Sequence, residues 1–396
     1  MSNNWNVVPF TEAVDICDTL RKPINSSERA SRIKGKEQSE LYPYYGATGQ
    51  VGFIDDYITD GEYVLLGEDG APFLDAFSNK AYIISGKTWV NNHAHVLKSK
   101  TNNKFLCYYL NSFNYKGYVS GTTRLKLTQA EMKRIPVPVP PLPEQERIVA
   151  RIEELFSQLD AGVETLKKTK AQLAVYRQAV LKEAFNSAEV DCKMLPIAEI
   201  LTKTRKGMST GPFGTMIKKS DHKATGVPML GIENIGRGQF VDGNKIYVTA
   251  EKAEELKAFS LKAGDIIISR SGTVGEICAV PERAEGSLLS TNLMRVSLDN
   301  TMIRSDYFIA LFQSKGIVLD QIKELCKGST RDFLNQTILK QIVFPVPSME
   351  KQEEIVSIIE ARTSVCDSIE QTVDTALQQA EAMRQSILKD AFEGKL

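Results

Sequence analysis

Two short segments of the chain bring glycine, hydroxyl and guanidinium groups together. Residues 121–124 (GTTR) recur in the second half as residues 328–331 (GSTR). Backbone N–H, hydroxyl and guanidinium groups all donate hydrogen bonds to phosphate, and an Arg side chain can also donate to the edge of a guanine. A turn closed by an ion pair is the alternative, because a residue that can cap a short helix, Thr128 or Asn335, follows each segment. The two segments are therefore candidate contacts to a nucleic acid.

Charge is distributed unevenly around these segments, although the formal net charge of the chain is zero. Residues 80–134 contain ten basic residues and one acid, whereas residues 38–79 contain eight acids and no base. The second half opens with a similar basic stretch, residues 203–223, which contains a single acid. A charge run is often only a solvated face. Because these stretches also carry glycine-rich loops with hydroxyl groups, we favour local basic patches for a nucleic acid.

Sequence motifs for catalysis, cofactor binding and metal binding are not found. Residues 86–88 (GKT) resemble the end of a phosphate-binding loop, but Ala81 stands where that motif requires glycine. His93 and His95 alternate along an expected strand and share one face, yet no Cys or carboxylate pattern completes a metal site. Neither a Gly-x-Ser-x-Gly elbow nor a dinucleotide fingerprint is present. We therefore expect no catalysis, no cofactor and no metal on this chain.

An internal duplication extends well beyond the two glycine-containing segments. Residues 121–185 align with residues 328–392 without a gap. Upstream, residues 105–112 (FLCYYLNS) resemble residues 307–314 (YFIALFQS), with shifting offsets as expected where loops vary. Each copy is therefore expected to be a mixed, strand-rich globular part followed by one long helix.

A long helix is expected at the end of each copy. Residues 144–185 contain no proline, and their apolar residues are spaced alternately by four and three. This period over about five heptads is typical of a coiled coil, and about 42 residues make a rod of about 63 Å. Such a rod is longer than a domain of about 150 residues. We therefore favour antiparallel pairing of the two helices, related by a pseudo-two-fold axis, over packing of each helix on its own globular part. The expected contact residues are Ile148, Ile152, Leu155, Leu159, Leu166 and Leu173 in the first helix, and Ile355, Ile359, Ile369, Val373, Met383 and Ile387 in the second.

Length and composition are those of an ordinary globular protein. The chain has 396 residues, of which 42% are hydrophobic and 25% charged, so we expect two or three domains and no global disorder. No apolar run approaches the ~18 residues of a membrane helix, and the first residues lack the pattern of a secretory signal. The six cysteines are scattered without a CxxC pair, which is typical of reduced thiols in the cytoplasm. We expect a cytoplasmic protein that does not interact with membranes.

Seven stretches of the sequence resemble the specificity subunit of type I restriction-modification systems, and together the resemblance covers essentially the whole chain. The entry into the second long helix departs from the family's proline-rich pattern, since residues 347–352 read PSMEKQ; we expect no functional consequence. The matching stretches are residues 42–49 (YPYYGATG), 61–70 (GEYVLLGEDG), 89–95 (WVNNHAH), 121–127 (GTTRLKL), 140–146 (PPLPEQE), 264–275 (GDIIISRSGTVG) and 388–396 (LKDAFEGKL).

The duplication and the resemblance together imply an α+β fold. Two mixed, strand-rich target recognition domains would be separated by two long antiparallel coiled-coil helices. Residues 1–142 and 188–347 would form the recognition domains, and residues 143–187 and 348–396 the spacer helices. Each domain would read one half of a bipartite, asymmetric DNA site, and the halves should differ because the two domains differ in sequence.

The resemblance also implies the partners. The paired helices would dock two methyltransferase subunits, and restriction and translocation subunits would join through them. Those partners would bind S-adenosylmethionine, Mg²⁺ and ATP, with none of these on this chain. Two alternatives stay open: a self-contained DNA-modifying enzyme, and a coiled-coil adaptor that does not contact DNA.

The candidate DNA-binding residues come from the basic loops and from the stretches that match the family. Within these stretches the repeat pairs His95 with Arg295. The candidates of the first copy are Lys87, His93, His95, Thr122, Thr123, Arg124 and Lys126. Those of the second copy are Lys206, Thr210, Phe213, Arg270, Ser271, Arg295, Ser329, Thr330 and Arg331.

Overall fold

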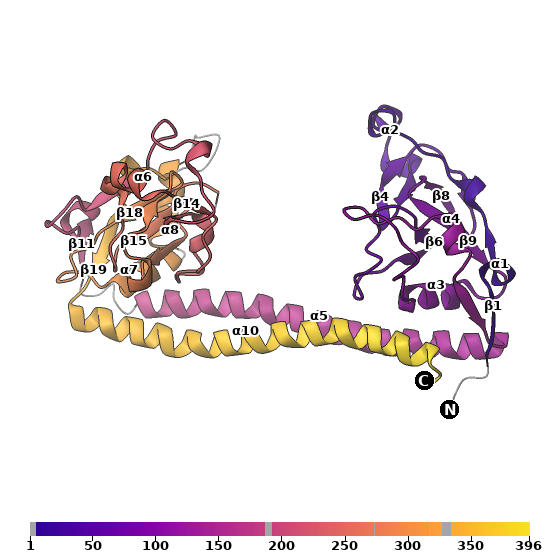
Figure 1. Cartoon of the computed structure of the whole chain (residues 1–396). Helices are drawn as coiled ribbons and strands as arrows, with labels where there is room; N and C mark the ends of the chain where they lie inside the picture. Colours follow the sequence, from indigo (N-terminus) through magenta and orange to yellow (C-terminus); the bar gives the residue numbers. More distant parts are fainter. Residues whose placement is uncertain (1–4, 187–191, 273, 315, 327–333) are drawn as a thin grey trace. The chain divides into compact units, whose positions relative to one another are not determined.

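The structure is a computed structural model, and it describes residues 5–186, 192–272, 274–314, 316–326 and 334–396. Its contacts divide the chain into two units, Met1–Lys168 with Val373–Leu396, and Thr169–Thr372. The two long helices, α5 (Leu142–Asn186) and α10 (Met349–Phe392), each contribute to both units (Figure 1).

The described residues of the first unit form two four-stranded sheets and one two-stranded ribbon. The first sheet has the strand order β2-β9-β6-β7, and all its neighbouring pairs are antiparallel. In the second sheet, of order β4-β3-β8-β5, the central pair β3 and β8 is parallel. The ribbon pairs β1 with β10. The strands are β1 (Asn6–Pro9), β2 (Val14–Ile16), β3 (Tyr42–Gly46), β4 (Gly49–Ile54), β5 (Thr59–Asp60), β6 (Tyr63–Gly67), β7 (Ala81–Ile84), β8 (Lys87–Val90), β9 (Ala94–Ser99) and β10 (Pro136–Val139).

Helix α3 (Asn103–Ser112) packs on β6 and β7 and closes the core of the first unit. Strand β6 is buried on both faces: Val64 and Leu66 share a buried cluster with Leu110 of the helix, whereas Leu65, on the opposite face, belongs to a second buried cluster. The helix begins where the side chain of Asn102 accepts a hydrogen bond from the backbone N–H of Phe105 (3.0 Å). The other short α-helices of this unit are α1 (Phe10–Ala13), α2 (Ser26–Ile33) and α4 (Gln129–Met132).

The described residues of the second unit repeat this topology, except that the mixed sheet has three strands where that of the first unit has four. Its antiparallel sheet has the order β12-β18-β15-β16, and its ribbon pairs β11 with β19. In its remaining sheet β13 pairs antiparallel with β14 and parallel with β17, just as β3 pairs with β4 and β8. The strands are β11 (Lys193–Pro196), β12 (Met208–Thr210), β13 (Val227–Leu230), β14 (Ile246–Val248), β15 (Ile266–Ser269), β16 (Ile277–Ala279), β17 (Leu288–Leu289), β18 (Leu293–Val296) and β19 (Val343–Val346); the α-helices are α6 (Ala250–Glu255), α7 (Ser305–Gln313), α8 (Val318–Cys326) and α9 (Gln336–Gln341).

The long helices α5 and α10 pack against each other in both units. In the first unit, Ile148 and Ile152 near the start of α5 share a buried cluster with Leu388 near the end of α10. In the second unit, the end of α5 and the start of α10 share a cluster that includes Phe185 and Ile355. The two helices therefore run antiparallel (Figure 1), as the sequence predicted.

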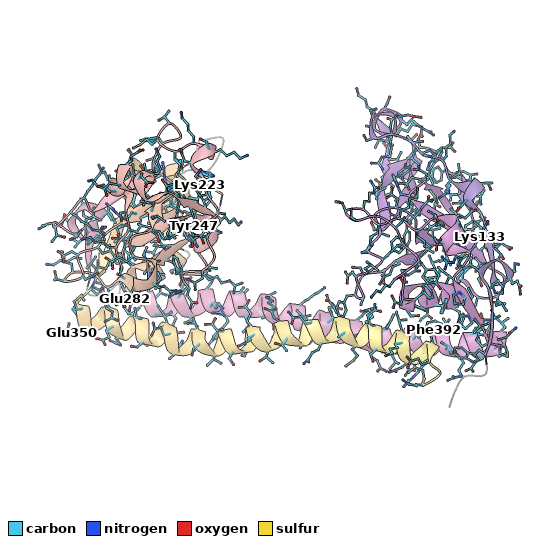
Figure 2. The ribbon with its side chains drawn as sticks, in the orientation of Figure 1. Lys133, Lys223, Tyr247, Glu282, Glu350 and Phe392 are labelled. Carbon is cyan, nitrogen blue, oxygen red and sulfur yellow. The ribbon has the colours of Figure 1, made fainter. Side chains whose placement is uncertain are left out.

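The last turn of each long helix also anchors a globular part through one aromatic ring. Phe392, labelled in Figure 2, is in the last turn of α10. Its ring packs edge-on against Phe105 of α3 with 5.2 Å between ring centroids. At the aligned position of the repeat, Phe185 packs against Tyr307 of α7 at 5.6 Å and the same interplanar angle of 66°. The duplication thus extends to individual side-chain contacts.

Two of the predicted coiled-coil residues do not lie between the helices. Ile369 and Met383 are 40% and 55% exposed. One residue later on the helix, Glu370 and Arg384 face inward instead, and both are ion-paired across the helices. The heptad pattern was assigned from apolar residues alone, so it could not anticipate inward-facing charges. Of the other predicted residues, Ile148, Ile152, Leu173, Ile355, Ile359 and Val373 are buried, and Leu155, Leu159, Leu166 and Ile387 are half-buried.

No helix in the described part of the chain is long and apolar enough to cross a membrane. Cys107 and Cys278 lie in the cores of their units, and burial raises the pKa of both thiols to about 12. These two thiols stay protonated at neutral pH.

Candidate nucleic-acid interface

The GTTR segment forms a tight loop that is fastened to the end of β6. Backbone hydrogen bonds in both directions between Ser120 and Lys126 (3.0 and 2.8 Å) close the loop. Gly121 has φ +99°, and a Cβ atom there would lie 2.3 Å from the carbonyl oxygen of Arg124, so this turn needs glycine. The N–H of Gly70 donates to the carbonyl of Leu125 (2.9 Å). The loop and the residues that follow β6 are therefore held as one piece.

Arg124 lies on this loop and pairs with an acid that follows β6. Its Nε lies 2.7 Å from Oδ1 of Asp69, while 59% of its side chain stays exposed. Oδ2 of the same carboxylate is 3.5 Å from Nδ1 of His93, whose side chain is also exposed. Gly70 (φ +78°) lies beneath the guanidinium group, since a Cβ there would be 3.1 Å from Nε. The turn with an ion pair is thus present, and it presents the arginine to solvent.

An open hollow of about 650 Å³ lies beside this pair. Small residues form much of its wall, and Asn91, His93, Thr123 and Arg124 contribute polar groups. Three candidates, His93, Thr123 and Arg124, therefore come together around one surface feature. Thr122 is exposed on the same loop, whereas Lys87 lies outside the hollow on β8, with Nζ 4.6 Å from the ring centre of Tyr57. The complete lining is Gly46, Ala47, Thr48, Val51, Asp69, Gly70, Ala71, Asn91, His93, Thr123, Arg124 and Leu125.

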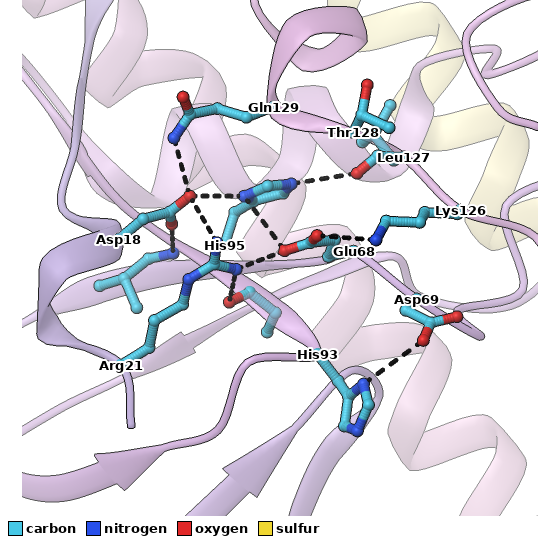
Figure 3. Close-up of polar contacts among 12 residues, drawn as sticks. Asp18, Arg21, Glu68, Asp69, His93, His95, Lys126, Leu127, Thr128 and Gln129 are labelled. Atoms are coloured by element: carbon cyan, nitrogen blue, oxygen red, sulfur yellow. Dashed lines mark hydrogen bonds and ion pairs between the residues drawn. The ribbon is translucent and has the colours of Figure 1, made fainter. Parts of the chain in front are cut away.

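His95 does not belong to this surface, which corrects the prediction that it contacts DNA. It is fully buried, with Nδ1 2.8 Å from Asp18 Oδ2 and Nε2 3.1 Å from the carbonyl oxygen of Leu127 (Figure 3). Burial raises the pKa of the Asp18 carboxyl, but hydrogen bonds from His95, Val96 and Gln129 outweigh burial and hold that pKa below its usual value. His95 and Asp18 therefore anchor the end of the GTTR loop from below.

Glu68 holds the same loop through its side chain and its backbone. Its carboxylate pairs with Arg21 and lies 3.4 Å from Nζ of Lys126 (Figure 3). Its carbonyl accepts from the N–H of Leu127 (2.8 Å). Lys126, a candidate DNA contact, is half exposed and is positioned by this carboxylate.

The second unit has the same arrangement of backbone hydrogen bonds. The N–H of Arg270 donates to the carbonyl of Asn292 (2.9 Å), and its carbonyl accepts from Leu334 (3.0 Å). Glu68 makes the equivalent bonds with His93 (2.8 Å) and Leu127. The glycine two residues further on has nearly the same φ in both units, +78° at Gly70 and +81° at Gly272.

These matched bonds align Ser271 with Asp69 and Asn292 with His93. In the second unit, Ser271 Oγ and Asn292 Oδ1 are 3.3 Å apart. Where the first unit has a carboxylate beside an imidazole, the second therefore has a hydroxyl beside an amide. The two matched surface positions carry different chemistry.

Two candidates of the second unit, Arg270 and Arg295, are buried, so the prediction that they contact DNA is corrected. Arg270 donates through Nε to the carbonyl of Leu334 and through Nη1 to that of Thr291, both at 3.2 Å. Arg295 donates to the carbonyls of Ser260 (2.9 Å) and Lys206 (3.0 Å). Burial lowers the pKa of both guanidinium groups. Both side chains fasten loops.

The strand register explains why the repeat misplaced Arg295. His95 stands opposite Leu66 of β6, whereas Met294, not Arg295, stands opposite the matching Ile268 of β15. A shift of one residue turns a side chain to the other face of a strand. Arg295 therefore has no structural equivalence to His95.

Phe213 is displayed on a rigid turn of the second unit. The residue is 67% exposed. The preceding Gly211 packs so closely on Ser290 that a Cβ would lie 1.9 Å from its carbonyl oxygen, and Thr291 Oγ1 donates to the carbonyl of Pro212 (2.8 Å). Lys206 is exposed and Thr210 is half-buried on β12, whereas Ser329, Thr330 and Arg331 lie outside the described residues.

The sequence analysis missed Asp69, Asn91 and Asn292. Glu68-Asp69 directly follows an apolar strand run in the sequence, which was the available signal. Acids count against contact with a polyanion, so the pair was overlooked. Within the described residues, no group of three or more His, Cys, Asp or Glu side chains could hold a metal ion.

A protein-family model for the type I restriction modification DNA specificity domain matches residues 4–174 and 200–379. The chain belongs to this family. It is 29% identical to a type I restriction enzyme specificity subunit of Haemophilus influenzae, across 94% of this chain and 91% of that protein. It is 26% identical to the EcoBI specificity subunit of Escherichia coli, across 92% of this chain and 79% of that protein.

A solved structure adds the likeness in fold. One chain from a study of complex assembly and conformational transition in a type I restriction-modification system covers 100% of this chain at a TM-score of 0.70 and 16% identity. The prediction of a specificity subunit is confirmed. The chain is a specificity subunit of a type I restriction-modification system, with two DNA recognition domains.

Proposed function

We propose that the two domains read the two unlike halves of a bipartite, asymmetric DNA site in the cytoplasm. Residues 1–142 and 188–347 are the recognition domains, and residues 143–187 and 348–396 are the spacer helices. The observation that carries the proposal is the matched surface position with different chemistry, Asp69 and His93 in one domain and Ser271 and Asn292 in the other. The two domains place different hydrogen-bond donors and acceptors at the same position of the fold. Such a difference is what two half-sites of different sequence require.

The first domain presents Arg124, Thr123, His93 and Lys126 to its half-site, because these side chains are exposed and lie on one anchored surface. In the second domain we assign this role to Ser271, to Phe213 and, by the repeat, to Arg331. Phosphate contacts from partner subunits compensate for the zero net charge of this chain.

The exposed side of the long helices is the proposed docking surface for two methyltransferase subunits. Tyr176, Ile369 and Met383 share one heptad position and are large, apolar and exposed. Large apolar side chains that stay exposed are typical of a partner surface. The methyltransferase subunits supply S-adenosylmethionine chemistry, and the restriction and translocation subunits that join through them use Mg²⁺ and ATP.

Methylation mapping tests the proposal. The chain is expressed with its methyltransferase subunits in a host that lacks other DNA methylation, and we expect one bipartite sequence with two different halves. Arg331→Ala should weaken DNA binding by the assembled complex by about 1–3 kcal/mol if this residue reads a base. Methyl transfer by the isolated chain would favour the self-contained enzyme, and methylation without a defined bipartite sequence would favour the adaptor.

A further inference from the structure

Arg124 is paired with Asp69 through one edge of its guanidinium group, which leaves the other edge available to a ligand. Its Nε is occupied by Asp69 Oδ1 at 2.7 Å, and Gly70 leaves room for the guanidinium plane to lie across the backbone. Among the described residues, no hydrogen-bond partner approaches the two terminal amino groups of this arginine. The guanidinium group therefore has one fixed edge and one open fork of two N–H donors.

The open fork suits a base better than a phosphate. Asp69 compensates the positive charge of Arg124 and would itself be repelled by a phosphate, so the pair gains little from the charge of the DNA backbone. A guanine edge offers two acceptors, O6 and N7, that match two parallel N–H donors, whereas adenine offers one acceptor and one donor. Geometry, not net charge, governs that contact.

We propose that Arg124 reads a guanine in the half-site of the first domain, and that Asp69 is the positioning residue that fixes the orientation of the guanidinium fork. This inference rests on the proposed function. The second carboxylate oxygen of Asp69 faces His93 at 3.5 Å, which limits rotation of the carboxylate. The hollow beside the pair, walled by small residues such as Gly46 and Ala47, leaves space for the edge of a base to approach.

The second domain provides an internal control in the same molecule. At the matched position it has Ser271 beside Asn292, and neither side chain carries a charge that could hold a guanidinium group as Asp69 does. A change at Asp69 or Arg124 should therefore alter one half-site and leave the other half-site as it was.

The test maps methylated sites for the full chain assembled with its methyltransferase subunits. The wild-type complex should require a G·C pair at one position of one half-site. Arg124→Lys keeps the charge but loses the fork, so preference for that pair should fall by roughly 5- to 150-fold. Asp69→Asn should lower the preference for the G·C pair at the same position, but by less than Arg124→Lys does. Arg134→Lys, which alters another exposed and ion-paired arginine of this domain, should leave both half-sites unchanged.

Three outcomes would overturn the inference. The affected half-site could lack a required G·C pair, both half-sites could change together, or Arg124→Lys could lower methylation equally at all sites, as loss of a phosphate contact would. Each variant's thermal unfolding is measured alongside, because a purely structural role of Asp69 would lower stability without changing the preferred base. A wild-type complex with no defined bipartite site would refute the proposed function itself, and the guanine assignment with it.

Discussion

At the scale of single residues, burial separates structural charges from charges that face a partner. His95 and Asp18 form a buried pair that holds the end of the GTTR loop, whereas Arg124, on the same loop, is exposed and pairs with Asp69, which follows β6. Residue type does not distinguish the two pairs. Burying charged groups is costly unless they are paired and hydrogen-bonded, and hydrogen-bond partners accordingly surround the inner pair. The outer pair remains available to a ligand.

The inner pair makes the first unit sensitive to acid. The pKa of Asp18 is below its usual value in the folded protein, so the folded state binds the proton less tightly than the unfolded state. The stabilisation is complete above the ordinary Asp pKa of about 3.9 and is lost as the pH falls through the lower folded value. We expect Asp18→Asn to destabilise the unit by about 1–3 kcal/mol at pH 7 and by progressively less below pH 4.

Hydrogen exchange of residues 5–142 between pH 7 and pH 3 measures this effect. Asp15→Asn is the matched control. Asp15 is close to Asp18 in the sequence but is exposed, and its Oδ1 lies 3.8 Å from Nζ of Lys100. Equal effects of the two substitutions, or a constant effect of Asp18→Asn across this pH range, would contradict the assignment.

At the scale of elements, the long helices pack with apolar residues on one side of the contact and ion pairs on the other. In the second unit Arg177 donates to Asp367 (2.6 Å) and Glu370 (3.1 Å), and in the first unit Arg384 pairs with Asp160 at the aligned positions. The stem of a long Arg side chain can cover apolar surface while its head stays paired. Both copies of the repeat therefore contain the apolar residues and the ion pair of the contact between the helices.

Two isoleucines of α10 distinguish the inner from the outer face of the helix pair. Ile355 is fully buried, so Ile355→Ala should destabilise the second unit by about 2–5 kcal/mol. Ile369→Ala removes an exposed side chain and should change stability by no more than about 0.5 kcal/mol. The same substitution should weaken binding of a methyltransferase subunit if the exposed side of the long helices is the docking surface. Urea unfolding and calorimetric titration measure the two effects, and equal loss of stability would contradict the observed packing.

At the scale of the whole molecule, the chain is one architectural unit used twice. Both units have the same strand order in the antiparallel four-stranded sheet, the same parallel pair and the same ring contact at the end of a long helix. Each unit also borrows its second helix from the other half of the sequence, because α5 and α10 each contribute to both units. A half-chain therefore lacks a partner for its only long helix.

A fragment of residues 1 to about 190 should therefore form a homodimer. The buried face from Ile148 to Val180 would otherwise be exposed to water. A second fragment offers the same helix, and its Phe185 can take the place that Phe392 occupies on Phe105. With methyltransferase subunits, this dimer should methylate a palindrome built from the first half-site.

Size-exclusion chromatography with light scattering measures the dimer, and methylation mapping measures the palindrome. Phe185→Ala should weaken the dimer, whereas Val175→Ala, at an exposed position of the same helix, should not. A folded, soluble monomeric fragment would show that the helices do not need each other.

The sequence by itself determined the duplication, the two long antiparallel helices, the family and the loop that carries Arg124. These features follow from local periodicity, from glycine and proline placement and from repeated motifs, which are all visible along the chain. It also placed Thr128 as the cap of α4, whose side chain accepts from the N–H of Glu131 (3.3 Å).

Only the tertiary structure decided which charged residues face outward. The sequence analysis predicted His95, Arg270 and Arg295 as DNA contacts, but all three are buried. It did not include Asp69, which pairs with Arg124, among the site residues. Burial depends on which loops cover a strand, and the strand pairing matches His95 with Met294, one residue away from the Arg295 that the sequence repeat had paired with it. The sequence analysis also did not predict the inward-facing charges on the long helices, because their ion-pair partners lie far away in the sequence. Long-range pairing has no local signal, and it alone separates the anchoring charges from those that can reach DNA.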